Sequence, residues 1–132
     1  MSYFPHEFIH LYQDGAYSGG ISQYHKKTGH PNIEFETFFL TDLFKSIYGY
    51  PGSISGAPSN SPLFYEYSEW IYGLSGMWPF TYSQFLSHHY NGYTYLDFLT
   101  NFKNYMPGCN YPINSTLQPA VIIEFLHYSN CW

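Results

Sequence analysis

Residues 32–48 read NIEFETFFLTDLFKSIY, and no other segment of the chain shows a helical pattern as clearly. Its large apolar residues recur with the 3.6-residue period of an α-helix that buries one face. These residues are Ile33, Phe35, Phe38, Phe39, Leu43, Phe44 and Ile47. Asn32 is a suitable N-cap, because its side-chain oxygen can accept a hydrogen bond from a backbone N–H group of the first turn. We therefore predict a helix over residues 32–48.

The same period, together with the residues that typically begin and end helices, predicts five further helices along the chain. The expected segments are Pro5–Gln13, ended by Asp14-Gly15; Ser61–Leu74, opened by Ser61-Pro62; Tyr82–His89, capped by Thr81; and Tyr95–Tyr105, capped by Thr94. The last segment is capped by Ser115 or Thr116, has Pro119 in its first turn, repeats apolar residues over Ala120–His127 and ends near Ser129. No segment shows a convincing strand pattern. The predicted fold class is mainly α, with about six helices.

A chain of 132 residues is long enough to bury a hydrophobic core, and one domain is the natural organisation at this length. The stretch YPGSISGAPSNSP, residues 50–62, is rich in Gly, Ser and Pro and has the composition of a linker. We predict a single domain over residues 1–132. Within it, residues 1–50 precede the linker-like stretch and residues 61–132 form a helical remainder.

The composition is unusual, with 23% aromatic residues, among them 16 Tyr and 12 Phe, and only 10% charged residues. Four basic residues against nine acidic ones, and a net charge of −5, leave no positive surface for phosphate groups, so we expect no nucleic-acid partner. The chain contains neither a long apolar run nor the basic and apolar pattern of a signal peptide. We expect a soluble protein without a transmembrane segment, whose compartment the sequence does not indicate.

Residues 6–10 read HEFIH, an HExxH sequence on the first predicted helix. Residues four apart project from the same face of a helix, so His6 and His10 can bind one Zn²⁺ through their imidazole rings. Glu7 lies beside that face, where a carboxylate can deprotonate a water polarised by the metal. The motif predicts a zinc site with His6 and His10 as ligands and Glu7 as general base.

A third ligand would distinguish a zinc site from a chance HExxH sequence. The extended motif HExxHxxGxxH is excluded, because residues 13 and 16 are Gln and Ala. Glu34 and Glu36 instead follow His10 by 24 and 26 residues, at the start of the best-defined helix, past a loop long enough for an antiparallel return. The spacing alone does not choose between these two glutamates.

Other residues offer alternatives at the same site. His25 or His30, in the loop between the two motifs, can supply a nitrogen ligand in place of Glu34. Asp42 can either hydrogen-bond to a ligating histidine and orient it, or lie exposed to solvent on its helix. Three residues further along the chain are candidates for stabilising an oxyanion, although a surface role is the simpler expectation for them: His88, His89 and Tyr90.

The two motifs resemble those of gluzincin-type zinc metallopeptidases. HEFIHLYQ resembles their HExxHxxQ helix, and NIEFETFF resembles a second motif in which a metal-binding glutamate precedes a small residue and often an acid, as in ExxAD. The resemblance covers Pro5 to Leu43. It implies that His6, His10 and Glu34 bind Zn²⁺ and that Glu7 is the catalytic base for hydrolysis of a peptide or protein substrate. Phe38 stands where such motifs carry the acid.

The resemblance also implies a β-sheet before the HExxH helix, with an edge strand that aligns the substrate backbone, yet five residues precede His6. We therefore expect a zincin-like pair of helices without most of this sheet, as in a truncated or degenerate member. The rival hypothesis is a non-catalytic helical interaction module that uses its exposed aromatic face to self-associate or to bind a partner chain. Whether Cys109 and Cys131 form a disulfide stays open.

The aromatic residues gather near both motifs. Phe8 and Tyr12 lie on the first predicted helix, and Phe35, Phe38 and Phe39 lie on the second. We expect these residues to pack around the helices of the metal site, and the aromatic residues after Pro62 to face the surface that a sheet or partner would cover.

Overall fold

The computed structural model of the protein describes residues 6–129, with the side chains of residues 7–127. The mainly α fold class is confirmed, since the described residues form six α-helices and no strand. The elements are α1 (His6–Ala16), the 3₁₀-helix η1 (Ser22–Tyr24), α2 (His30–Tyr48), α3 (Phe64–Gly76), α4 (Tyr82–Ser87), α5 (Tyr95–Tyr105) and α6 (Ala120–Ser129). Pro5, the first residue of the first predicted helix, lies outside the described residues.

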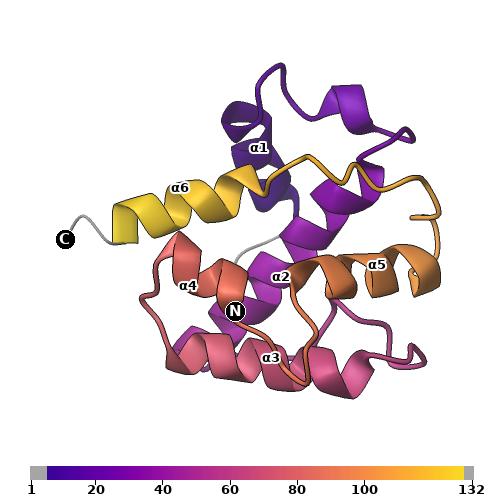
Figure 1. The fold of residues 1–132 in the computed structure, drawn as a ribbon. Coiled ribbons are helices and arrows are strands. Elements are labelled where there is room, and N and C mark those ends of the chain that lie inside the picture. The colour runs from indigo at the N-terminus through magenta and orange to yellow at the C-terminus, as the bar shows by residue number, and fades with distance from the viewer. Residues whose placement is uncertain (1–5, 130–132) are drawn as a thin grey trace.

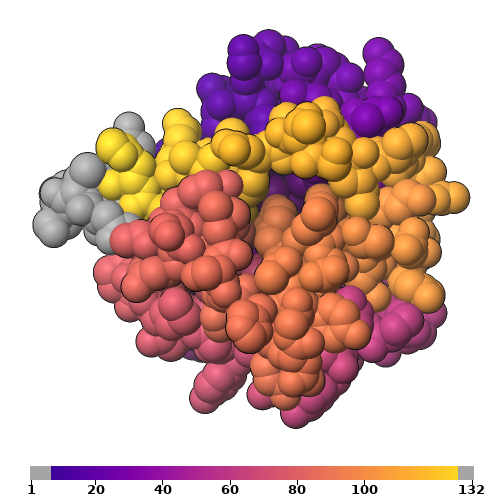
Figure 2. Space-filling model, viewed as in Figure 1, coloured from indigo at the N-terminus to yellow at the C-terminus, as the bar shows by residue number. Residues whose placement is uncertain are grey.

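Helix α2 is the central element, and α1, α3, α5 and α6 all pack against it (Figure 1). Helices α1 and α3 lie at opposite ends of the molecule in this view, with α2 between them. In the space-filling view, α6 and the segment before it form a band between the N-terminal part of the chain and helices α4 and α5 (Figure 2). One hydrophobic core contains residues from both sides of residues 50–62, from Ile9 to Leu126.

Aromatic rings fill the centre of this core. Phe39 is fully buried, and its ring lies 5.2 Å from Trp70 and 5.4 Å from Tyr95, measured between ring centroids. Phe35 packs in the same way against Tyr95, at 5.1 Å. These rings pack α2, one of the two helices of the predicted metal site, against α3 and α5. Much of the aromatic excess serves the core.

The start of α2 differs from the prediction that Asn32 is its N-cap. Gly29 is the N-cap, in a left-handed conformation with φ of 96°, and Pro31 lies in the first turn. Asn32 is buried and pairs with the backbone of Asn114, accepting from its N–H and donating to its carbonyl, both at 3.0 Å. Its amide therefore ties α2 to the segment before α6 instead of capping the helix.

Helix α1 continues to Ala16, past the Asp14-Gly15 pair that was expected to end it. Ile9 and Gln13 on one face of α1 are fully buried, at 1% and 0% exposure. Tertiary packing of that face outweighs the roughly 1 kcal/mol helix penalty of a single glycine.

The predicted starts of α4 and α5 are confirmed. The Thr81 hydroxyl accepts from the Gln84 N–H at 3.1 Å, while the Gln84 side chain accepts from the Thr81 N–H at 2.8 Å. At α5 the Asp97 carboxylate accepts from the Thr94 N–H at 2.9 Å. These bonds supply acceptors for backbone N–H groups at the start of each helix, which have no acceptor within the helix itself.

Residues 50–62 form a loop that is anchored to the core rather than a free linker. The buried Asp42 carboxylate of α2 accepts from the N–H groups of Ser55 and Gly56, at 2.9 and 2.7 Å, and from the hydroxyl of Tyr67 at 2.6 Å. Burial raises the pKa of Asp42, and these donors act against that shift. Asp42 thus holds the loop to α2 and α3, and neither orients a metal ligand nor lies in solvent.

Within the described part of the chain, no helix combines the length and hydropathy needed to cross a membrane. Cys109 is buried and forms no disulfide with any described residue, and Cys131 lies outside the described residues. Burial raises the pKa of the Cys109 thiol to about 11.

Candidate metal centre

The packing of α1 on α2 brings the two sequence motifs together. The Nε2 atom of His10 lies 3.0 Å from the Oε2 atom of Glu34, and each side chain is 23% exposed. His10 projects from the second turn of α1 and Glu34 from the second turn of α2. The structure therefore places two of the three predicted metal ligands in direct contact.

Gln13 holds His10 from the other side of the ring. The Gln13 Nε2 atom donates to the backbone oxygen of Ile33 and to Oε1 of Glu36, both at 2.9 Å. Both partners are acceptors, so the amide nitrogen must face them and the amide oxygen must face His10. The Nδ1 atom of His10 lies 2.7 Å from that oxygen and is therefore the donor in the bond.

This assignment decides which nitrogen of His10 is available for chemistry. With the Nδ1 hydrogen donated to Gln13, Nε2 either holds a second proton in an ion pair with Glu34 or offers a lone pair. The pKa of His10 is raised, mainly by its hydrogen bond to Glu34, with smaller contributions from the charges of Glu34 and Glu7 and the bond to Gln13, against partial burial. A metal ion would compete with this proton for Nε2 and Glu34.

The two atoms are spaced as zinc ligands require. With bonds of about 2.1 Å to nitrogen and oxygen, two ligands of tetrahedral zinc lie on the order of 3.4 Å apart. The contact between Nε2 of His10 and Oε2 of Glu34 is 3.0 Å. Exchange of the shared proton for a metal ion therefore needs a separation of only a few tenths of an ångström.

The remaining residues of the predicted site lie on the first turn of α1. His6 is the first residue of α1, and its side chain lies outside the described residues. Glu7 is exposed and lines the same cavity as His10 and Glu34. Among the described side chains, no three His, Cys, Asp or Glu residues form a group arranged to hold a metal ion. A complete site on these residues thus depends on His6.

A cavity of about 710 Å³ opens beside the His10–Glu34 pair. Its walls come from α1, from the loop that contains η1, and from the start of α2. The residues that line it are Glu7, His10, Leu11, Asp14, Ile21, Ser22, Tyr24, His25, His30, Ile33 and Glu34. This volume falls within the range of small-molecule and substrate sites, and most of the residues that line the cavity are polar or ionisable.

Glu36 is not part of this cavity. It is fully buried, and its carboxylate accepts from Gln13 and Tyr17 through Oε1 and from the N–H groups of Val121 and Ile122 through Oε2, at 2.8 to 3.1 Å. Burial raises its pKa, and the four donors act against that shift. Of the two glutamates that the spacing left open, Glu34 faces the cavity and Glu36 caps α6 from within the core.

This role of Glu36 overturns the predicted cap of α6. Thr116 does not cap the helix, because its N–H and hydroxyl both donate to the side-chain oxygen of Asn114, at 3.1 and 2.8 Å. The first free N–H groups of α6 point instead at a carboxylate 85 residues earlier in the chain. No local sequence signal marks such a long-range cap.

His30 cannot replace Glu34 as a ligand through Nε2 without breaking an existing bond. Its Nδ1 atom accepts from the backbone N–H of Lys26 at 2.8 Å, so the ring hydrogen lies on Nε2. Burial, the largest influence, lowers the pKa of His30 and so favours the neutral ring. His25 lies against it, with ring centroids 5.5 Å apart. Both histidines line the cavity without completing a metal-binding group with the other described residues.

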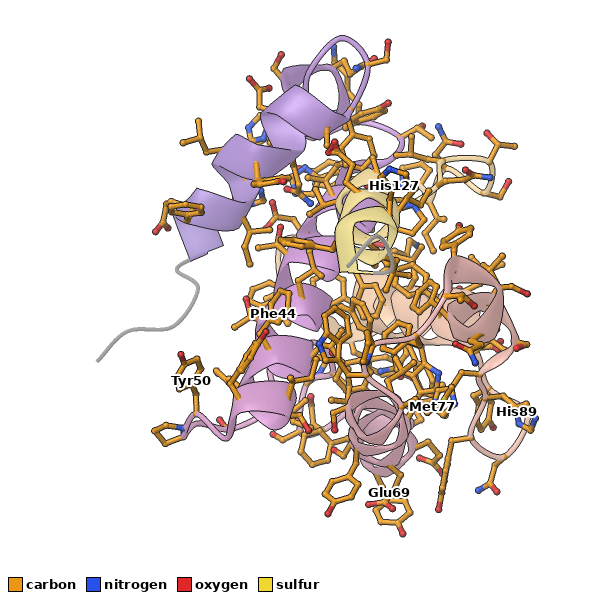
Figure 3. All side chains as sticks on the ribbon, turned by 90° about the vertical axis from the view of Figure 1, so that its left-hand side faces the viewer. Phe44, Tyr50, Glu69, Met77, His89 and His127 are labelled. Atoms are coloured by element: carbon orange, nitrogen blue, oxygen red, sulfur yellow. The ribbon has the colours of Figure 1, made fainter. Side chains whose placement is uncertain are left out.

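The other candidates lie elsewhere. The His88 ring stacks on Trp70, and its Nε2 lies 3.1 Å from the Trp70 carbonyl oxygen, so it has a structural partner. His89 is exposed and lies far from α1 (Figure 3). Tyr90 interacts with Tyr65 on the surface of α3. None of the three lines the cavity.

The contacts of Gln13 with His10 and with α2 were not predicted from the sequence. The only signal was its place one turn after His10, where an i, i+3 contact is expected on a helix. Phe38, at the position of the missing acid, instead packs against Phe102 at 5.6 Å. The Oε1 atom of Gln13, and no acid at position 38, accepts from the Nδ1–H group of His10.

Comparison with known proteins found no relative of this chain. No family model matches the chain, and neither a curated protein nor a solved structure is significantly similar to it.

Proposed function

We propose that the protein is a zinc-dependent hydrolase of peptide bonds, with His6, His10 and Glu34 as metal ligands and Glu7 as general base. The observation that carries the proposal is the contact between His10 and Glu34 at the edge of a cavity, with the imidazole held by Gln13. Ligating histidines usually donate their second ring hydrogen to such a partner, which fixes the ring and its tautomer.

The chain's own residues would divide the work as follows. Bound zinc would polarise a water molecule and lower its pKa to about 7. Glu7, exposed on the cavity wall one turn before His10 and Leu11, would accept the proton of that water and later pass it to the leaving amine. The cavity would hold the peptide against these groups.

Substitution of Glu7 tests the hydrolytic part of the proposal. Because Glu7 is a base and not a ligand, Glu7→Gln should reduce cleavage of a fluorogenic peptide library at least a hundredfold while zinc content stays unchanged. Glu69→Gln, at an exposed position on α3, is the matched control and should keep full activity. Equal hydrolysis by wild type and Glu7→Gln would refute the role of Glu7.

The interaction module remains a second candidate, and one observation favours it. Helix α1 exposes Phe8, Leu11 and Tyr12, at 53%, 72% and 38% of their surfaces. These side chains, together with Gly15 and Ala16 of the same helix and Glu124 of α6, line a groove of about 420 Å³. A zinc-loaded wild-type protein that hydrolyses no peptide, but whose oligomeric state changes with Leu11→Lys, would support this second function.

A further inference from the structure

His30 has a hydrogen-bond donor that no described residue uses. Its Nδ1 accepts from Lys26, which places the ring hydrogen on Nε2. No described side-chain nitrogen or oxygen is both buried and without a partner, so an Nε2 without a protein partner must be open to solvent. Since His30 lines the cavity, this N–H group is available to a molecule bound there.

The ring is fixed in this orientation from several sides. It lies 5.5 Å from the ring of His25 and 5.0 Å from that of Tyr111, measured between centroids. The Lys26 bond has a length of 2.8 Å. Partial burial lowers the pKa of His30, so the ring stays neutral near pH 7 and presents a donor without a positive charge. A neutral donor suits a peptide carbonyl oxygen.

The position of His30 relative to the metal ligands shows which part of a peptide it can reach. His30 precedes Glu34 by one turn of α2, and residues four apart on a helix have Cβ atoms about 5–6 Å apart. An extended peptide advances about 3.3 Å per residue. A donor on His30 is therefore near enough to reach a backbone carbonyl oxygen one to two residues from a bond held beside Glu34.

We propose that His30 is a substrate-binding residue that donates a hydrogen bond from Nε2 to a backbone carbonyl oxygen flanking the cleaved peptide bond. This inference rests on the proposed function. In peptidases with an edge strand, the strand supplies hydrogen bonds to the substrate backbone. The described residues contain no strand, so the hydrogen bond from His30 would supply such a contact here. Because the contact exists before and during the reaction, it should lower KM and leave kcat unchanged.

The kinetic test compares three variants of the full, zinc-loaded chain on one fluorogenic peptide. His30→Phe keeps the ring stacking but removes the donor, and should raise KM about three- to tenfold with kcat within twofold. His30→Gln has both an acceptor for Lys26 and a donor for the substrate, and should restore most of the affinity. His89→Phe, at an exposed position outside the cavity, is the control and should behave as wild type. A fall in kcat alone, or an unchanged KM in His30→Phe, overturns the proposal.

A measurement without turnover separates this proposal from the function it rests on. In metal-free protein with ¹⁵N-labelled histidine, His30 should show hydrogen on Nε2 and none on Nδ1. Addition of tetra-alanine blocked at both ends should shift the His30 Nε2 resonance more than those of His25. Hydrogen on Nδ1, or no shift with the peptide, overturns the assignment of His30. Absence of zinc binding and hydrolysis in wild type would refute only the proposed function.

Discussion

At the scale of single residues, Gln13 fixes the orientation of the His10 imidazole by accepting from its Nδ1–H group. Gln13 contacts His10, Ile33 and Glu36 at once, so the orientation of His10 depends on the packing of α1 against α2. A neutral acceptor makes the imidazole less basic than a carboxylate would. Nε2 of His10 lies 3.0 Å from Oε2 of Glu34, so the two side chains can share a proton, and in our proposal zinc would replace that proton.

The raised pKa of His10 leads to a pH-dependent stability. A raised folded-state pKa stabilises the fold below the unfolded value of about 6.5, and this contribution is lost as pH rises through the folded pKa. As pH rises from below about 6.5 through the folded pKa of His10, we expect the difference in unfolding free energy between metal-free wild type and His10→Gln to decrease. Urea titrations from pH 5.5 to 8.5 measure it.

Zinc should reverse this trend, because the ligand is the deprotonated imidazole. The stabilisation that zinc confers should grow over the same pH range in wild type and be absent in His10→Gln. A metal-free stability difference that does not change with pH would show that the His10–Glu34 ion pair does not form in solution.

At the scale of elements, the buried carboxylate of Glu36 connects α1, α2 and α6. Its four donors come from α1, from Tyr17 just after α1, and from the first turn of α6. The Tyr17 hydroxyl also accepts from the Ala120 N–H at 3.2 Å. A negative charge at a helix N-terminus is favoured by the helix dipole, which helps to offset the cost of burial.

Replacement of Glu36 tests this connection. Glu36→Gln keeps the volume but replaces one acceptor oxygen with an NH₂ group that faces other donors, and should lower the unfolding free energy by about 2–4 kcal/mol. Glu69→Gln, on the exposed face of α3, should change it by less than about 0.5 kcal/mol. Hydrogen exchange should show earlier opening of α6 in Glu36→Gln. Equal stability of the two variants would contradict the capping role.

The elements also show where sequence reasoning succeeded. Local signals sufficed for α5, whose bounds match the prediction, because Thr94 and Asp97 form its start within one turn. They failed where the partner lies far along the chain, as at Asn32 and Glu36. The motif spacing predicted that Glu34 or Glu36 would meet His10, and the resemblance to the second motif chose Glu34. The contact of Gln13 with His10 required the packed structure.

At the scale of the whole molecule, one aromatic core joins the helices before and after residues 50–62. Helix α2 belongs both to this core, through Phe35 and Phe39, and to the cavity, through His30 and Glu34. The core thus fixes one wall of the site, while α1 and the η1 loop supply the others. The aromatic composition, which first suggested a missing partner surface, largely reflects how this core is built.

The central claim, a zinc site on α1 and α2, is tested most directly by metal content. Protein purified without added zinc should contain about one zinc per chain, and addition of Zn²⁺ to metal-free protein should raise Tm by several degrees. His10→Ala and Glu34→Ala should lose both the metal and the shift, whereas Glu69→Ala should keep them. No bound zinc in wild type, with an unchanged Tm on adding Zn²⁺, would contradict the account.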